Sequence, residues 1–199
     1  MKKLHERQDS VVVKAGSSKP YVPPVEYDLA SFNKLRNDLI ARAPKEDVVY
    51  KGFIESLDDI VSPYYQMTNL AGWGGLPATQ THYFVVAPAD EAAKAGKPSS
   101  ITFKAPPLQY DRAGYWSITV YNAEGWVETK PFKLSSLEAK PSDDGSYRLH
   151  FNGPEGSINN IHVPANWNAL FRCYLPNSLD AILTFQKDID ENHKVVADQ

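Results

Sequence analysis

From Thr81 onward, hydrophobic and polar residues alternate in short runs, and this alternation is the strongest constraint on the fold. The clearest run is 116–121 (Trp-Ser-Ile-Thr-Val-Tyr), in which large residues alternate with small polar ones. A period of two places successive side chains on opposite faces of a β-strand. The sequence therefore predicts a series of short strands. Similar runs occur at 81–87, 101–105, 132–134, 147–151 and 169–174.

Turn-forming residues separate these runs. Residues 122–125 (Asn-Ala-Glu-Gly) suit a hairpin loop into a strand at 126–127, and 143–146 (Asp-Asp-Gly-Ser) suit a turn before 147–151. Aromatic residues favour half-buried strands, and they make up 12% of the chain. Strands that follow each other without crossover helices pair antiparallel. We therefore predict a mainly β fold, an antiparallel sandwich over 64–189.

The first third of the chain has a different pattern, extended and then helical. Prolines and serines over 1–27 disfavour helix and predict an extended leader, and we expect a tail at 190–199. Asp28 is suited to cap a helix that ends before Pro44. The apolar residues at helical spacing in this helix are Leu29, Phe32, Leu35 and Leu39.

Two further helices are predicted. One covers 46–57, and the proline that follows it would stop it. With the first helix it forms a short helical segment, 28–63, that we expect to pack on the sandwich. At the other end of the chain, Asn177 or Ser178 is suited to cap a C-terminal helix over 179–188.

The charge balance argues against nucleic acid as a partner. Lys and Arg number 21 against 24 Asp and Glu, whereas a phosphate backbone requires a concentrated positive surface. The basic start of the chain lacks the apolar stretch of a secretory signal, and no apolar run reaches the ~18 residues of a membrane span. We therefore expect a cytoplasmic chain with no nucleic-acid and no membrane partner. Cys173 is the sole cysteine, which excludes an intrachain disulfide and favours packing in a strand.

No signature of a known catalytic class occurs in the sequence. The phosphate-loop, H-E-x-x-H, EF-hand and G-x-S-x-G patterns are all missing. The glycine-rich segment 72–77 does not match a dinucleotide-binding fingerprint, and its glycines are expected to permit a tight backbone path. Whether the chain is catalytic, and which cofactor it would use, stay open.

Three histidines, His82, His150 and His162, lie in or near predicted strands. Distant strands meet in a sandwich, and three imidazoles would suit zinc. Their spacing matches no metal-binding motif, and three unrelated polar strand positions explain them equally well. We therefore predict no metal site.

Seven side chains are candidates for contacting a ligand. Trp and Tyr offer a flat face with a hydrogen-bonding edge, which suits a ring or a sugar. Arg172 could clamp a carboxylate through two parallel hydrogen bonds. The alternative is that aromatic residues at alternating strand positions fill the core and that Arg172 binds loop carbonyls. The candidates are Trp116, Tyr121, Trp126, His162, Trp167, Arg172 and His82.

Three blocks of sequence resemble one known family. Residues 115–126 (Tyr-Trp-Ser-Ile-Thr-Val-Tyr-Asn-Ala-Glu-Gly-Trp) resemble the F-W-S-x-T-x-Y-[DN]-x-x-G motif of the domain of unknown function 1214 family. The Asp-Gly-Ser at 144–146 and the segment 166–176, with Asn-Trp and then Phe-Arg-Cys-Tyr-Leu-Pro, resemble its next two blocks. The resemblance implies a jelly-roll-like sandwich, often preceded in longer relatives by a second uncharacterised domain, number 1254. It implies no activity, cofactor or catalytic residues.

Three functions remain as hypotheses. The first is a non-catalytic module that binds a small molecule or assembles with copies of itself as a homo-oligomer. The second is an enzyme acting on a small aromatic, terpenoid or carbohydrate-like substrate, with His82 or His162 as the base, Arg172 as the anion clamp, and Trp116 and Trp126 as the platform. The third is a viral structural or host-interaction component, which rests on analogy of fold alone. We favour the first because the catalytic signatures are missing.

Overall fold

The computed structural model describes residues 10–12, 14–20, 22, 28–43, 46, 51–71 and 74–198. The chain divides into two units, 1–37 and 38–199. The helix predicted from the apolar spacing after Asp28 is present as α2 (Leu29–Arg42). It crosses the boundary between the two units in the sequence. The Asp28 carboxylate accepts hydrogen bonds from the backbone N–H groups of Ala30 and Ser31, both at 3.1 Å, which confirms its capping role. The packing of the 28–63 segment on the sandwich stays a prediction.

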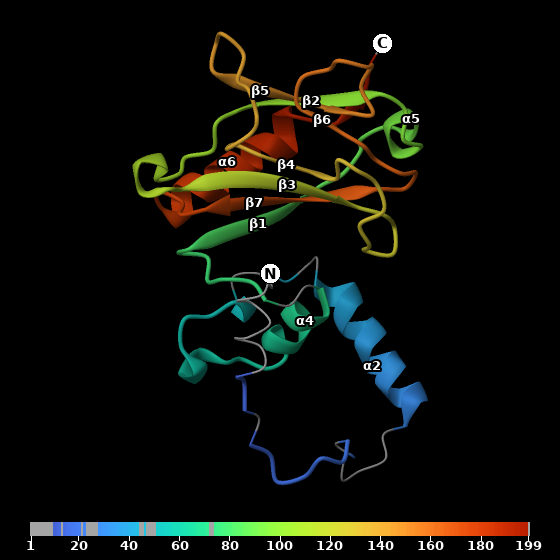
Figure 1. Ribbon diagram of the computed structural model, residues 1–199, viewed down its shortest axis with the longest axis vertical. Coiled ribbons are helices and arrows are strands. Elements are labelled where there is room, and N and C mark those ends of the chain that lie inside the picture. Colours follow the sequence, from blue (N-terminus) through green and yellow to red (C-terminus); the bar gives the residue numbers. More distant parts are fainter. Residues whose placement is uncertain are drawn as a thin grey trace. The chain divides into compact units, whose positions relative to one another are not determined.

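The first β-sheet has four antiparallel strands in the order β1-β7-β3-β4 (Figure 1). Its central strands, β7 and β3, pair along seven residues, from Tyr115 opposite Tyr174 to Tyr121 opposite Asn168. Each strand confirms a run of alternating sequence. The bounds are β1 (Thr81–Val86), β3 (Tyr115–Tyr121), β4 (Lys133–Ser135) and β7 (Asn168–Tyr174).

The second sheet has the order β6-β5-β2-β8. Its long strands, β2 and β5, pair antiparallel along six residues, whereas β6 runs parallel to β5. The two-residue strands β6 and β8 were not predicted, because pairs of residues carry no periodicity. The bounds are β2 (Ser99–Lys104), β5 (Ser146–Phe151), β6 (Asn160–Ile161) and β8 (Val196–Ala197).

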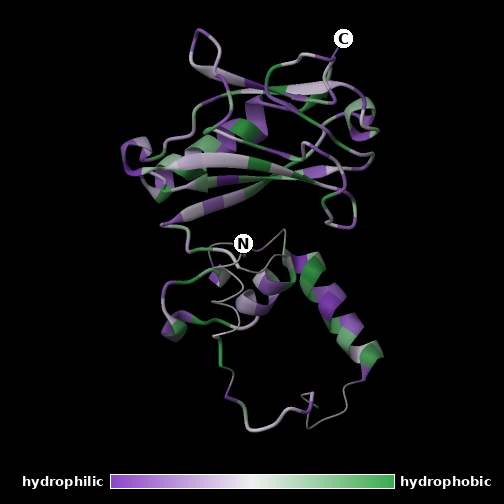
Figure 2. Ribbon diagram, in the orientation of Figure 1, coloured by the Kyte–Doolittle hydropathy of each residue, from purple (hydrophilic) through white to green (hydrophobic). Residues whose placement is uncertain are grey.

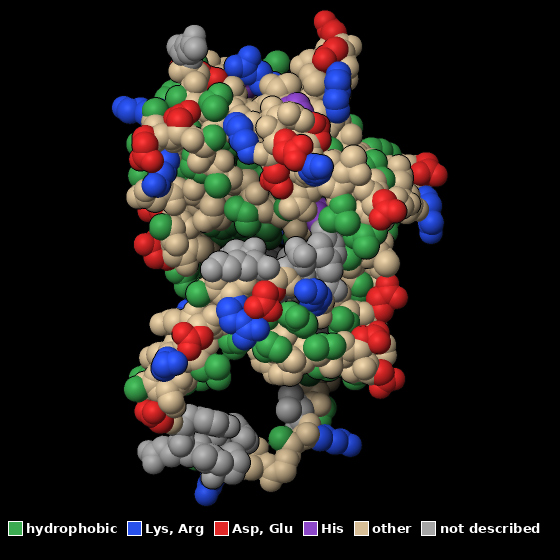
Figure 3. All heavy atoms as spheres, turned by 180° about the vertical axis from the view of Figure 1, so that it is seen from behind, with side chains coloured by type: hydrophobic (Ala, Val, Ile, Leu, Met, Phe, Trp, Pro, Cys, Tyr) green, Lys and Arg blue, Asp and Glu red, His purple; other side chains and the backbone are tan. Residues whose placement is uncertain are grey.

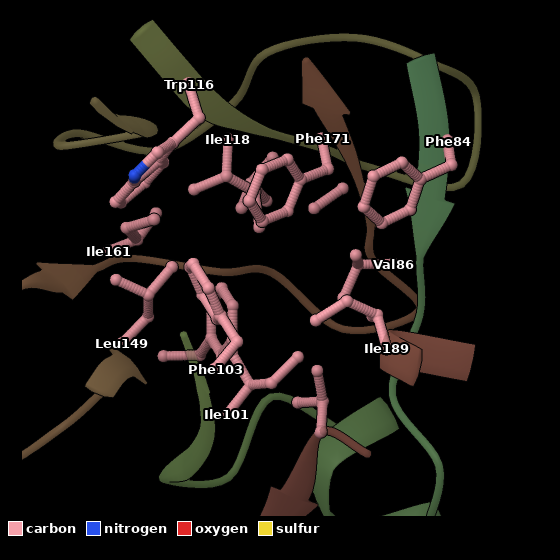
Figure 4. Packing of buried hydrophobic residues seen from close by; sticks show 14 of the residues in the cluster. Phe84, Val86, Ile101, Phe103, Trp116, Ile118, Leu149, Ile161, Phe171 and Ile189 are labelled. Atoms are coloured by element: carbon pink, nitrogen blue, oxygen red, sulfur yellow. The ribbon is translucent and has the colours of Figure 1, made fainter. Parts of the chain in front are cut away.

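One continuous hydrophobic core is formed by the inward residues of the two sheets (Figure 4). Trp116 of β3 is fully buried, and its ring meets Phe103 of β2 edge-on at 5.4 Å. Phe171 of β7 stacks on Phe84 of β1 at 4.9 Å and also contacts the Phe103 ring. Burying a large apolar side chain contributes about 1.5–3 kcal/mol. These contacts explain why the alternating aromatic residues form a mainly β domain.

Helix α6 (Leu179–Asn192) lies between the two sheets (Figure 1). Both hydrophobic and hydrophilic residues occur along it (Figure 2), and its Ile182 and Ile189 are buried. Its Phe185 ring contacts aromatic rings of both sheets. The Ser178 hydroxyl accepts a hydrogen bond from the Ala181 N–H at 3.2 Å, so the predicted cap and C-terminal helix are confirmed. The helix extends four residues beyond its predicted end at 188.

The helix predicted over 46–57 is wrong in its second half. Residues 51–52 are helical and 47–50 lie outside the described residues, but 53–56 form no helix. Ser56 adopts an extended conformation and caps a separate 3-10 turn, Leu57–Asp59, through its hydroxyl. Pro63 immediately precedes helix α4 (Tyr64–Ala71) and does not stop a helix. Its fixed φ and missing N–H suit the start of a helix, and its carbonyl accepts from Met67 at 3.0 Å.

The strand predicted at 126–127 is also wrong. The Asn122 side-chain oxygen accepts hydrogen bonds from the N–H groups of Glu124 and Trp126, at 3.1 and 2.9 Å, and closes a local turn. The chain returns to β3 only at β4, so the connection is a long loop. A short helix, α5 (Glu91–Lys94), and a 3-10 turn, Tyr110–Arg112, were not predicted. Within the described ranges, no helix has the length and apolar character needed to cross a membrane.

Candidate functional site

The structure places the seven candidate residues in different surroundings, some in the core and others on the surface. Trp116 and Trp167 point into the core, with 0% and 2% of their surface exposed. The Trp167 indole N–H donates to the Ala93 carbonyl at 2.9 Å. Both therefore have the structural role that was the alternative to ligand contact. Cys173 is buried in β7 as expected, and burial raises the pKa of its thiol.

The histidines do not come together. His82 is fully buried in β1, and its Nε2 lies 2.6 Å from Oε1 of Gln186 in α6. His150 belongs to β5 in the other sheet, and His162 follows β6 with an exposed side chain. Among the described residues, no group of three or more His, Cys, Asp or Glu side chains could hold a metal ion.

The combination suggested for an enzyme is not assembled in one place. In the β3–β7 register Trp116 pairs with Cys173, so both point inward, and Arg172 one residue away points outward. Trp126 lies outside the sheet, on the loop closed by Asn122, and is 73% exposed. The platform, the base and the clamp thus lie in different parts of the domain.

Arg172 and Tyr121 do come together, on the outer face of the first sheet. One terminal guanidinium nitrogen of Arg172, Nη1, donates to the Thr119 hydroxyl at 2.9 Å, and the other, Nη2, donates to the Tyr121 hydroxyl at 2.8 Å. These partners fix the guanidinium across β3. Neither partner carries a charge. No carboxylate in the described part of the chain forms an ion pair with Arg172.

An open depression of about 390 Å³ lies beside Arg172 and is lined by residues of β3, β4, β7 and the turn after β4. Its lining includes three hydroxyl groups, from Ser117, Thr119 and Ser135. Ser117 pairs in register with both Arg172 and Ser135, so Arg172, Ser117 and Ser135 lie side by side in one row across the sheet. We refer to the two serines as the hydroxyl row. Donors and a fixed cation therefore line one side of the same space.

Two tyrosines line the depression on the neighbouring row of the sheet. Tyr115 and Tyr174 pair in register, and their rings stack at 4.3 Å with an angle of 13° between their planes. Burial raises the pKa of Tyr174 to about 12, and the neighbouring Tyr115 adds to the shift. The Tyr174 hydroxyl is therefore neutral across the physiological pH range.

Two charged side chains from β4 and the turn after it complete the lining. Lys133 contributes a second positive charge and Glu138 a negative charge, and both are exposed. The three charges of the depression sum to one positive charge. On the face of the molecule shown in Figure 3, acidic and basic side chains are interspersed. The whole chain has a formal net charge of −3, so the positive charge at this depression is local.

Of the lining residues, the sequence identified Arg172 but not the hydroxyl row or Lys133. The signal was present in the alternation of β3. Because Trp116 and Ile118 are buried, Tyr115, Ser117 and Thr119 had to share the opposite face. The neighbouring strand was predicted at 132–134, but its pairing with β3 and its register, which bring Ser135 beside Ser117, could not be read from the sequence.

Two four-stranded sheets, a shared apolar interior and a helix in contact with both sheets define a mainly β domain. Residues 80–178 match the model of a family described as "Protein of unknown function (DUF1214)". The chain belongs to this family, as the three sequence blocks indicated. The matched range contains all of the first sheet and the whole lining of the depression.

Two solved structures of bacterial proteins are similar to the chain. The VPA0106 protein from Vibrio parahaemolyticus has a TM-score of 0.54 and 19% identity, and the match covers 79% of this chain and 43% of that one. An uncharacterized protein from Burkholderia cenocepacia has a TM-score of 0.36 and 12% identity, with 75% and 38% covered. The first likeness shows a shared fold. The chain spans less than half the length of either protein. No curated protein matches the chain.

Proposed function

We propose that the domain is a non-catalytic binding module that takes a small molecule bearing an oxyanion on the outer face of β3, β7 and β4. One observation carries this proposal. The half-buried guanidinium of Arg172 is held by two neutral hydroxyls beside an open depression, with no carboxylate paired to it among the described residues.

The energetic reason lies in the charge of that guanidinium. Partial burial removes water from a cation, and a neutral hydrogen-bond partner replaces only part of the lost solvation. A bound anion would supply the rest, because charge-assisted hydrogen bonds are about twice as strong as neutral ones. Thr119 and Tyr121 hold the side chain in place before the ligand arrives, so little side-chain entropy is lost on binding.

The composition of the lining favours binding over catalysis. The depression is lined by hydroxyls, tyrosines, one arginine, one lysine, one leucine and one glutamate, without a histidine or cysteine. The hydroxyls of Ser117 and Ser135 lie in the same row of the sheet as Arg172. Among the described residues, neither hydroxyl is hydrogen-bonded to a general base. An activated nucleophile requires such a base within hydrogen-bond reach. The lining therefore supports recognition of a ligand.

An NMR titration with acetate and with inorganic phosphate tests this proposal. We expect backbone amide shifts confined to β3, β4 and β7, and we expect Arg172→Gln to abolish them. Arg112→Gln is the matched control, because Arg112 is exposed on the 3-10 turn and bonds only to Gln109 at 3.0 Å among the described residues. Shifts that persist in Arg172→Gln, or that disappear equally in Arg112→Gln, would overturn the proposal.

A second candidate function, self-assembly, is favoured by the position of β1. This strand is at the edge of its sheet and pairs only with β7 in the described part of the chain. Val85 on this edge strand is 60% exposed. An unpaired edge is a template for pairing with a strand of a second copy. We expect a dimer in the native mass spectrum of the wild type and a monomer for Val85→Lys, and a monomeric wild type would contradict this candidate.

The finer description of the fold is also a proposal. We propose that the eight strands form a jelly-roll-like sandwich, the architecture implied by the family resemblance. Two sheets of four strands around one core support this description. An experimental structure in which the strands follow a different path between the sheets would refute it.

A further inference from the structure

We propose that the ligand of the β3–β7–β4 depression is an aromatic monocarboxylate, a planar ring of one or two fused cycles with a single carboxylate. This inference rests on the proposed function, since it names the chemical class of ligand for the same site. It follows from three separate properties of the lining: its charge, its hydrogen-bond donors and its aromatic surface.

The charge of the site selects a monoanion. Arg172 and Lys133 contribute two positive charges and Glu138 one negative charge, so one negative charge on the ligand makes the site neutral. A carboxylate brings that single charge. A phosphate monoester brings about 1.5 to 2 negative charges near neutral pH and would place the excess close to Glu138. The same lining that attracts a carboxylate therefore disfavours a phosphate monoester.

The donors match the two oxygens of a carboxylate. A guanidinium has five N–H groups. In Arg172, two of them donate to the hydroxyls of Thr119 and Tyr121. The remaining donors can bind a carboxylate in the bidentate geometry typical of arginine. The Ser117 and Ser135 hydroxyls continue the same row and can donate to the outer lone pairs of the carboxylate.

The tyrosine pair provides the surface for a ring. Tyr115 and Tyr174 occupy the row next to that of Arg172, in register with each other and stacked at 4.3 Å. Aromatic rings that stack or meet edge-on gain free energy beyond that of area burial alone. Leu137, also in the lining, is 78% exposed and offers further apolar surface. A volume of about 390 Å³ lies at the lower end of small-molecule sites and limits the ligand to one or two rings.

Isothermal titration calorimetry with three probes tests the proposed class. The probes are 2-naphthoate, cyclohexanecarboxylate and phenyl phosphate. Comparing the first two tests the need for an aromatic ring, and comparing 2-naphthoate with phenyl phosphate tests the preference for a carboxylate over a phosphate. We expect 2-naphthoate to bind at least about tenfold more tightly than either of the others, a difference of ~1.4 kcal/mol. Equal affinities for 2-naphthoate and cyclohexanecarboxylate would overturn the aromatic part of the proposal. Tighter binding of phenyl phosphate than of 2-naphthoate would overturn the charge argument.

Three variants assign the selectivity to individual residues. Arg172→Gln should abolish binding of all three probes, with Arg112→Gln as the control. Tyr115→Leu should weaken 2-naphthoate several-fold and leave cyclohexanecarboxylate unchanged. Glu138→Gln should improve phenyl phosphate more than 2-naphthoate, because it removes the negative charge that opposes the second charge of the phosphate. Thermal melting of each variant confirms that it is folded.

The outcomes distinguish this inference from the function on which it rests. If acetate and all three probes bind with equal affinity and depend on Arg172, the module binds oxyanions but the aromatic class is wrong. If Tyr115→Leu lowers the affinity for all probes equally, the tyrosines do not select a ring and the class is again wrong. If no probe and neither simple oxyanion binds in an Arg172-dependent way, both proposals fail.

Discussion

Replacing Trp116 by Ala tests the core that positions the candidate site. Trp116 is fully buried, and its ring contacts Phe103 at 5.4 Å, Tyr147 at 5.0 Å and Phe171 at 5.6 Å. These neighbours come from both sheets, so they cannot close over the space without moving the sheets relative to each other. We expect Trp116→Ala to lower the free energy of unfolding by about 3–5 kcal/mol.

The magnitude has two opposing parts. A buried Trp removes roughly 150–250 Å² from water, which at ~25 cal/mol per Å² corresponds to about 4–6 kcal/mol. The indole N–H, however, has no hydrogen-bond partner within the described structure, and a buried unpaired donor costs about 1–3 kcal/mol. Trp116→Phe removes that donor and keeps an aromatic ring. We therefore expect this variant to lose only about 1–2 kcal/mol.

Urea denaturation monitored by far-UV circular dichroism measures these differences as shifts of the midpoint at constant slope. Trp126→Ala is the matched control, because Trp126 lies in the same sequence block but is 73% exposed. Its unfolding free energy should stay within about 0.5 kcal/mol of the wild type. A loss below about 1 kcal/mol for Trp116→Ala, or equal losses for both tryptophans, would refute the inward orientation of Trp116 and with it the outward orientation of Arg172.

Two further predictions concern polar groups that hold the sandwich together. Asn152 has φ = 51°, and its side chain bonds the carbonyls of Gly96 and Val163, both at 2.8 Å. Asn152→Ala should lose roughly 2–4 kcal/mol in urea denaturation, because it removes these bonds and strains the backbone, whereas Asn152→Gly should lose less because the backbone strain is absent. Burial lowers the pKa of His82, and its hydrogen bond with Gln186 opposes this only in part. The unfolded chain therefore binds more protons below about pH 6.5, so stability should fall as the pH drops from about 7.5 to 5.5. His82→Gln should reduce that slope, and an unchanged slope would contradict the burial of a neutral imidazole.

The long strands and the two terminal helices could be predicted because each follows from local pattern. Alternation in 116–121 gave β3, helical spacing after Asp28 gave α2, and the serine at 178 gave the start of α6. The pairs β6 and β8 are too short to show a period. Pro63 was misjudged because proline fits both after a helix and at the start of one, and the sequence alone does not distinguish these positions.

The candidate site was predictable only in part. Arg172 was identified because an arginine side chain can clamp a carboxylate through two parallel hydrogen bonds. His82, Trp116 and Trp167 were considered with it because residue type carries no information about which face of a sheet a side chain occupies. The sequence showed which residues of a strand share a face, but which of the two faces points into the core depended on the residues packed against it. Lys133 and Ser135 became visible only when β4 was placed beside β3.

The sequence by itself determined the family, the mainly β character and the alternation that divides each strand into two faces, since these are properties of neighbouring residues. Tertiary structure alone decided that Arg172 would face Thr119, Tyr121 and the hydroxyl row rather than a histidine or a tryptophan. The physical reason is register. Hydrogen bonding between β3 and β7 fixes which residues stand opposite each other, and a shift by one residue would have turned Arg172 into the core.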